Sequence, residues 1–106
     1  YDGIILDPPK FGRGPNGETW RLEESLPELI DACQTLLRVD PEKRGSARGF
    51  FIATVYAVRL SYLALAQTAQ QAFEGAQGEW EVGEMALPCE GGDRVLPTAI
   101  FARWRG

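Results

Sequence analysis

The residues of this sequence that could do chemistry stand together near its beginning. Asp7, Pro8, Pro9, Lys10 and Phe11 follow one another directly. The two prolines fix φ at consecutive residues and remove two N–H donors, which holds the carbonyls of Asp7 and Pro8 in a fixed outward orientation. A carboxylate beside rigid carbonyls can accept hydrogen bonds from an amino group or a cationic ligand, and the Phe11 ring can stack on a nucleobase. A stiff turn supported by Asp7 is the alternative interpretation.

Basic and aromatic side chains elsewhere could contribute to the same site. Lys10, Arg13 and Arg21 place positive charges near the motif, where they could contact phosphates or serve only to solvate a loop. Tyr56 and Arg59 follow the next apolar run and could line the same site, although sheet packing and helix entry explain them almost as well. Arg13, Tyr56 and Arg59 are therefore candidate substrate-binding residues.

The composition excludes several kinds of catalytic site. The 106 residues include no His, which removes Ser-His-Asp, Cys-His and His-metal mechanisms. Cys33 and Cys89 have no partner at metal-binding spacing, so no metal is expected. A formal net charge of −4 argues against strong nucleic-acid binding by these residues alone. A 44% hydrophobic chain without a bilayer-length apolar run or a secretory pattern predicts a cytoplasmic globular protein.

An apolar strand is predicted to precede the motif and a helix to follow it. Residues 1–6 end in three consecutive apolar side chains, Ile4 to Leu6, which is typical of a strand covered on both faces in a parallel sheet. Gly, Pro, Asn and charged residues over 10–24 predict a long loop. Apolar residues at intervals of three and four then predict a helix over 25–38. Ser25 and Glu28 have the spacing of a capping box at its start.

The second half of the chain predicts another strand, another helix and a hairpin. After a charged linker over 39–48, residues 50–56 are aromatic and β-branched and indicate a second buried strand. Residues 60–74 suit a helix ended by glycine. Residues 80–87 and 95–104 indicate two strands joined by a short loop, which permits only antiparallel pairing. The predicted fold class is α/β, with the order strand-helix-strand-helix-strand-strand.

The first twelve residues, YDGIILDPPKFG, resemble a known family when they are taken together with this order of elements. They resemble the carboxyl-terminal half of class I S-adenosyl-L-methionine-dependent methyltransferases. More narrowly, they are similar to the bacterial 23S ribosomal-RNA large-subunit methyltransferases. The resemblance implies a Rossmann-like sheet, S-adenosyl-L-methionine (SAM) as cofactor, ribosomal RNA as acceptor and a role in rRNA processing.

The resemblance also implies roles for the residues of the motif. Asp7 would match an acidic residue beside the methionine end of the cofactor and the target base. Pro8 and Pro9 would match a rigid turn whose carbonyls face the base, and Phe11 an aromatic residue that packs against it. With Lys10, these residues form the expected catalytic segment.

The resemblance implies that residues 1–106 are a single partial domain. The glycine-rich loop and ribose-binding acid of the family belong to strands that would precede Tyr1, and the glycines between Gly12 and Gly17 do not open a helix. We therefore expect the amino-terminal, cofactor-binding half of the domain to lie outside residues 1–106. Without that half, residues 1–106 would be inactive.

One departure from the family concerns the acceptor atom. Members that methylate cytosine carbon-5 use a Cys nucleophile after the second strand, where this chain reads TVYAVR from Thr54 to Arg59. Cys33 lies on the apolar stripe of the first predicted helix, and Cys89 lies in the hairpin loop. Carbon-5 chemistry is thus in doubt, and transfer to a ring nitrogen, an exocyclic amine or a non-RNA acceptor remains open.

Two other functions compete with methyl transfer. A hydrophobic strand ending in Asp also resembles the magnesium-binding strand of nucleotide hydrolases, but the phosphate-binding loop that those enzymes need is missing from these residues. The chain could also be a non-catalytic α/β module that completes a sheet with another subunit.

Overall fold

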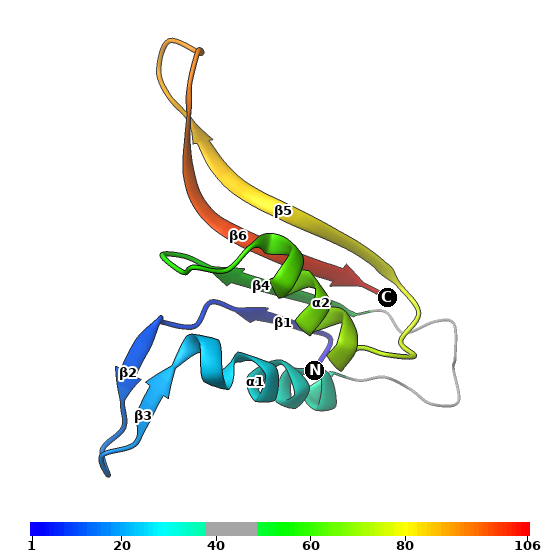
Figure 1. The fold of residues 1–106 in the computed structure, drawn as a ribbon. Helices are drawn as coiled ribbons and strands as arrows, with labels where there is room; N and C mark the ends of the chain where they lie inside the picture. The colour runs from blue at the N-terminus through cyan, green and yellow to red at the C-terminus, as the bar shows by residue number, and fades with distance from the viewer. Residues whose placement is uncertain (38–48) are drawn as a thin grey trace.

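The computed structural model describes residues 1–37 and 49–106, which form a mixed sheet with two helices on one face (Figure 1). The sheet has the order β1-β4-β6-β5, in which β1 and β4 are parallel and the other neighbours antiparallel. Its strands are β1 (Gly3–Leu6), β4 (Phe50–Val55), β5 (Glu79–Pro88) and β6 (Val95–Arg105). The predicted α/β class and order of the main elements are confirmed. The linker predicted over 39–48 lies outside the described residues.

Only one face of the sheet is covered by the helices. On β4 the side chains of Phe51, Ala53 and Val55 are buried, whereas Phe50 is 41% exposed. On β1 the side chain of Ile5 is 70% exposed. Successive side chains of a strand point to opposite faces, so these two residues lie on the face away from the helices. The prediction that both faces of these strands are covered is therefore wrong for the described residues.

Helix α1 (Leu22–Leu36) begins earlier than its sequence pattern predicts. Its N-cap is Arg21, which has extended backbone and makes no capping side-chain hydrogen bond. Ser25 lies inside the first turns, so the predicted capping box is wrong. The start is held instead by a hydrogen bond of 3.0 Å from the Leu22 amide to the Lys10 carbonyl. A tertiary contact thus replaces the local cap in satisfying an amide of the first turn.

The segment predicted as a long loop contains a second, two-stranded sheet. Strands β2 (Phe11–Arg13) and β3 (Thr19–Arg21) pair antiparallel, with Gly12 opposite Trp20. The turn between them is closed by hydrogen bonds between Gly14 and Glu18 and between Gly17 and Gly14. This β2–β3 hairpin leads directly from the Asp7 motif into α1.

Helix α2 (Tyr62–Ala72) packs beside α1 and completes the core. The Ser61 hydroxyl caps it by accepting a hydrogen bond of 3.2 Å from the Ala64 amide. Phe73 follows the helix and is 3% exposed, and its ring contacts those of Phe51, Trp80 and Trp104. This aromatic cluster fastens α2 to three strands of the sheet.

No helix within the described ranges is long and apolar enough to cross a membrane. In those same ranges, no three His, Cys, Asp or Glu side chains are grouped so that they could hold a metal ion.

Candidate functional site

The parallel register of β1 and β4 brings the Asp7 motif to a second strand end. Leu6 is paired with Ala53, so the next residues, Asp7 and Thr54, reach the same edge of the sheet together. The Thr54 hydroxyl donates a hydrogen bond of 2.7 Å to Asp7 Oδ1. This bond holds Oδ1 of the carboxylate, whereas Oδ2 takes no part in it. Thr54 was predicted only as part of the second buried strand, and its pairing with Asp7 was not predicted.

The two prolines after Asp7 are held by the β2–β3 hairpin. Pro8 is buried and Pro9 is exposed. The Trp20 indole Nε1–H donates a hydrogen bond of 2.6 Å to the Pro9 carbonyl, which ties the middle of β3 to the turn. Sequence analysis did not single out Trp20. The sequence did offer a signal for this role, because Trp20 is a large aromatic residue with an N–H donor inside a glycine-rich segment.

One face of the β2–β3 hairpin gathers an aromatic ring and two guanidinium groups. Phe11, Arg13 and Arg21 are exposed, whereas Gly12 and Trp20, which alternate with them, are half-buried. Phe11 is 53% exposed and lies opposite Arg21 in the register. We call Phe11, Arg13 and Arg21 the hairpin face. It has the combination of stacking surface and positive charge that suits single-stranded nucleic acid.

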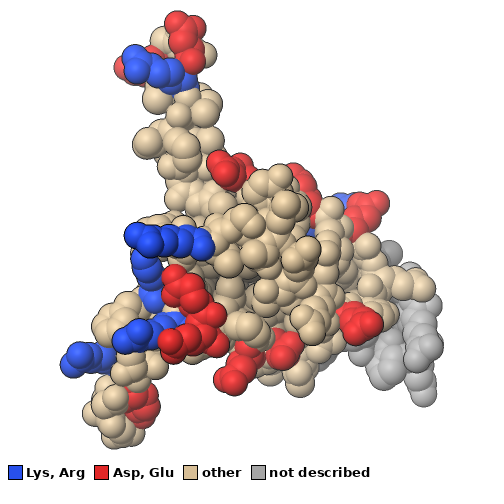
Figure 2. All heavy atoms as spheres, in the orientation of Figure 1, with Lys and Arg blue, Asp and Glu red and all other residues tan. Residues whose placement is uncertain are grey.

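The charge around the hairpin face is not uniform. Lys and Arg side chains gather at the end of the molecule that carries β2 and β3 (Figure 2). At the hairpin turn, hydrogen bonds from its own backbone amide and from that of Asn16 hold the pKa of Glu18 below its ordinary value. Glu18 thus remains an anion beside the basic residues, where its bond to Asn16 stabilises the turn.

Tyr56 and Arg59 lie in the segment that leaves the same edge of the sheet after β4. Both are exposed, and Ala57 between them has a φ of 54°, a conformation that is uncommon for residues other than glycine. Within the described residues, no hydrogen bond or ion pair joins Tyr56 or Arg59 to Asp7. The fold places Tyr56 and Arg59 at the same edge of the sheet as Asp7 without connecting them to the motif, so their role in substrate binding stays a prediction.

The two cysteines lie where their sequence context predicts. Cys33 is buried in the core, and burial raises the pKa of its thiol. Cys89 is exposed beyond the end of β5. A buried thiol with a raised pKa is a poor nucleophile at neutral pH.

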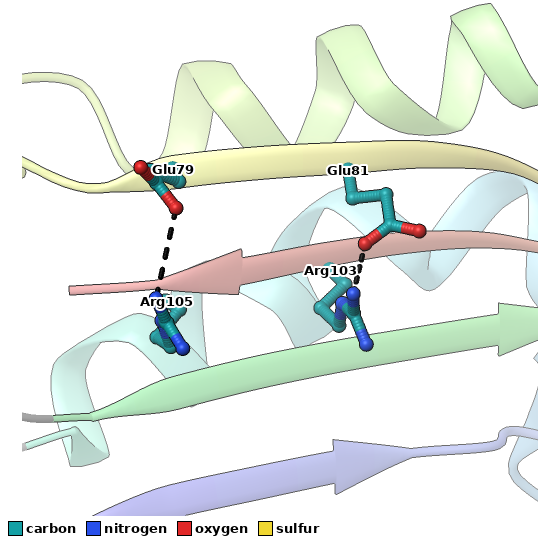
Figure 3. Close-up of polar contacts among 4 residues, drawn as sticks. All are labelled: Glu79, Glu81, Arg103 and Arg105. Carbon is teal, nitrogen blue, oxygen red and sulfur yellow. Dashed lines mark hydrogen bonds and ion pairs between the residues drawn. The ribbon is translucent and has the colours of Figure 1, made fainter.

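Four charged residues on the uncovered face of the sheet form a separate group (Figure 3). Arg103 pairs with Glu81, and Arg105 lies 3.8 Å from Glu79. Each pair joins β5 to β6, and all four side chains are more than half exposed. Solvent weakens such pairs, so they contribute little stability. They nevertheless neutralise two guanidinium groups, in contrast to the basic groups of the hairpin face.

Solved structures with the same fold include two methyltransferases. The SAM-dependent methyltransferase of Agrobacterium tumefaciens superposes with a TM-score of 0.82 and 36% identity, over 99% of this chain and 33% of its own. The protein SMU.776, a proposed methyltransferase solved in complex with SAH, superposes with a TM-score of 0.62 and 23% identity, over 98% of this chain and 26% of its own. This chain thus spans about a third and a quarter of their lengths. No family model and no curated protein matches it. The chain has the Rossmann-like fold of the carboxyl-terminal portion of a class I methyltransferase.

Proposed function

We propose that this chain carries the acceptor side of a SAM-dependent methyltransferase. The observation that carries the proposal is the Asp7–Thr54 pair, which stands at the carboxyl ends of two parallel strands and is followed by the Pro8-Pro9 turn. Ligands of open α/β sheets bind at that edge. SAM as the cofactor is supported by the Agrobacterium relative, which is described as SAM dependent, and by SMU.776, which was solved with SAH.

The residues at this edge suit a reaction that depends mainly on positioning. SAM, when bound, supplies an electrophilic methyl group next to a positively charged sulfur. Methyl transfer then requires the acceptor atom to be held in line with that group. The exposed Asp7 carboxylate can accept hydrogen bonds from an acceptor amine or face a cationic ligand, and Thr54 limits its orientation. The Pro8-Pro9 turn, held through Trp20, keeps the acceptor side rigid.

A second part of the domain is needed to complete this site. The glycines within residues 12–17 lie in the β2–β3 hairpin, not in a strand-to-helix turn that could bind the cofactor. Strand β1 forms an edge of the sheet, and Ile5 is 70% exposed on its uncovered face. The methyltransferases with this fold are three to four times as long as the matched region. We infer that a cofactor-binding part outside residues 1–106 covers this face and supplies most contacts to SAM.

RNA, and ribosomal RNA in particular, is the acceptor that we propose. The hairpin face offers the Phe11 ring for stacking and the guanidinium groups of Arg13 and Arg21 for phosphates. The net charge of −4 means that RNA contact must be concentrated at such a local basic face. The same concentration of charge makes the proposal testable by a small number of substitutions.

Methyl transfer itself is tested by Asp7→Asn in the complete enzyme that we infer. Asn retains the shape of Asp but removes the negative charge. We expect turnover to fall by about 100-fold, the scale on which one positioned group acts. Transfer of a radioactive methyl group from SAM to large-subunit ribosomal RNA measures it. Asp31→Asn, an exposed acid on α1, is the matched control. Unchanged turnover in Asp7→Asn would leave Asp7 with a structural turn role only.

RNA recognition is tested separately by the double variant Arg13→Ala, Arg21→Ala. A plot of the logarithm of RNA affinity against the logarithm of salt concentration has a negative slope. Each phosphate contact that is removed should reduce the magnitude of this slope by about 1. Filter binding over a salt series measures the slope. Arg94→Ala is the control, because Arg94 is exposed in the loop between β5 and β6, away from the β2–β3 hairpin. If the double variant binds RNA as the control does, the acceptor is not held by the hairpin face.

A further inference from the structure

Trp20 connects three parts of the molecule that surround the Asp7 motif. It lies in the middle of β3, and its half-buried ring packs against the hydrophobic core. Its indole N–H donates a hydrogen bond of 2.6 Å to the carbonyl of Pro9, in the turn that follows Asp7. One side chain thus joins the β2–β3 hairpin to the core and also to the motif.

The orientation of the β2–β3 hairpin depends on the bonds at its base. Its strands form a sheet of their own and pair with no strand of the four-stranded sheet. Figure 1 shows the hairpin projecting from the end of the sheet at which β1 ends. At its base, Trp20 bonds to Pro9, and the Leu22 amide bonds to the Lys10 carbonyl at 3.0 Å. Of these two bonds, only that of Trp20 comes from a side chain, so it can be removed without changing the backbone.

Trp20 lies on the opposite side of the hairpin from the residues that we propose to hold RNA. Side chains alternate along a strand, so Trp20 and the neighbouring Arg21 point to opposite faces. Arg21 is exposed and lies opposite Phe11, whereas Trp20 is half-buried and lies opposite Gly12. A change at Trp20 therefore leaves the hairpin face in place and alters only how the hairpin is held.

A comparison with Trp104 separates this bond from the ordinary pairing of a buried indole. A buried indole N–H usually finds an acceptor. Trp104 is 1% exposed, yet its Nε1–H has no acceptor within the described residues. Trp20 is only half-buried, so water could replace Pro9 as its acceptor and the bond contributes little to stability. The N–H that stability needs less is thus the one committed to the Asp7 motif.

We propose that Trp20 is a positioning residue for methyl transfer, which aligns the hairpin face with the Asp7 carboxylate. This inference rests on the proposed function, in which the hairpin face holds RNA and Asp7 meets the acceptor group. The base of the hairpin, where Trp20 holds the Pro9 carbonyl, then sets where the acceptor atom lies relative to Asp7. A small misplacement slows such a reaction, because the acceptor must be in line with the methyl group.

Removing the N–H while keeping the ring tests the proposal in the complete enzyme. Benzothienylalanine in place of Trp20 retains the bicyclic ring and has sulfur where the N–H stands. We expect kcat for methyl transfer to RNA to fall about 10-fold, with KM for RNA and the free energy of unfolding in urea unchanged. The double variant Arg13→Ala, Arg21→Ala should instead raise KM.

The same replacement at Trp80 is the matched control. Trp80 is also half-buried against the core, but it lies on β5 and packs edge-to-face on Phe73. Its replacement by benzothienylalanine should leave kcat unchanged.

Hydrogen exchange gives a second measurement that does not depend on activity. The indole N–H resonance of Trp20 is assigned by its loss in Trp20→Phe. Because this N–H is bonded to Pro9, it should exchange with deuterium at least about 10-fold more slowly than that of free tryptophan.

Four results would overturn the proposal. Wild-type kcat with benzothienylalanine at position 20 would show that the bond does not align the acceptor. An equal fall in kcat from the replacement of Trp80, or a loss of unfolding free energy that accompanies the fall in kcat, would assign Trp20 a structural role. Exchange as fast as in free tryptophan would show that the bond is not kept in solution. Failure of the wild-type enzyme to methylate RNA is a separate outcome, which would overturn the proposed function and the role of Trp20 with it.

Discussion

Removing the Thr54 hydroxyl should slow methyl transfer while leaving the fold intact. Thr54→Val retains the β-branched shape that suits strand β4 and removes only the donor that bonds Asp7 Oδ1 at 2.7 Å. We propose that this hydroxyl holds the Asp7 carboxylate in the orientation that meets the acceptor. Thr54 is in this sense a positioning residue, because it acts through Asp7.

The size of the effect follows from the hydrogen bond and its exposure. A hydrogen bond to a charged group contributes about 1.5–3 kcal/mol, and the lower end applies here because Asp7 is exposed and water can replace the hydroxyl. A preference of about 1.4 kcal/mol for one orientation corresponds to a tenfold change in its population. We therefore expect kcat to fall about 10-fold. The free energy of unfolding should fall by less than about 1.5 kcal/mol, since solvent compensates for part of the loss.

The assay measures kcat and KM for radioactive methyl transfer from SAM, together with the free energy of unfolding in urea. Thr54→Ser restores a hydroxyl at the same position and should recover most of kcat. Thr35→Val is the matched control, because the Thr35 hydroxyl also donates a hydrogen bond, of 3.0 Å, but to the Asp31 carbonyl within α1. It should leave kcat unchanged.

Two results would refute this reasoning. Wild-type kcat in Thr54→Val would show that the bond does not orient Asp7 for the reaction. Equal loss in Thr54→Ser and Thr54→Val would show that strand packing at Thr54, not its hydroxyl, affects the rate.

Four further predictions concern the cofactor, the thiols and the core. Calorimetry on residues 1–106 alone should detect no SAM binding, and micromolar affinity would place the cofactor site within them. Cys33→Ala and Cys89→Ala should leave methyl transfer intact, and RNA containing 5-fluorocytosine should form no covalent adduct; an adduct lost on either substitution would restore carbon-5 chemistry. Burial raises the pKa of the Cys33 thiol, so the thiol ionises more readily in the unfolded chain than in the folded protein. The free energy of unfolding should therefore fall as the pH rises above about 9. Phe73→Ala should lower the free energy of unfolding by about 3–5 kcal/mol in urea titration, since its ring packs 5.1 Å from those of Phe51 and Trp104; a loss below about 1 kcal/mol would contradict this.

The main strands and helices could be predicted from the sequence because their signals are local. The apolar run before Asp7, the stripe that includes Leu26 and Cys33, and the antiparallel pair at the end were each found within a few residues of their observed bounds. The β2–β3 hairpin could not be predicted in this way. Its three-residue strands are too short to show a periodic pattern, and the segment is held by the bonds of Trp20 to Pro9 and of Leu22 to Lys10.

For the site, the sequence by itself determined that a rigid acidic motif follows a strand and that the usual histidine chemistry is missing. Only the tertiary structure decided what Asp7 contacts, because Thr54 lies 47 residues away and meets it only through the parallel register of β1 and β4. Tertiary structure also decided which apolar side chains remain exposed. Ile5 and Phe51 read alike as members of buried strands, yet one is 70% exposed and the other fully buried, since the two helices pack on one face of the sheet alone. Strand propensity depends on a residue and its neighbours in sequence, whereas burial depends on what the completed fold places over each face.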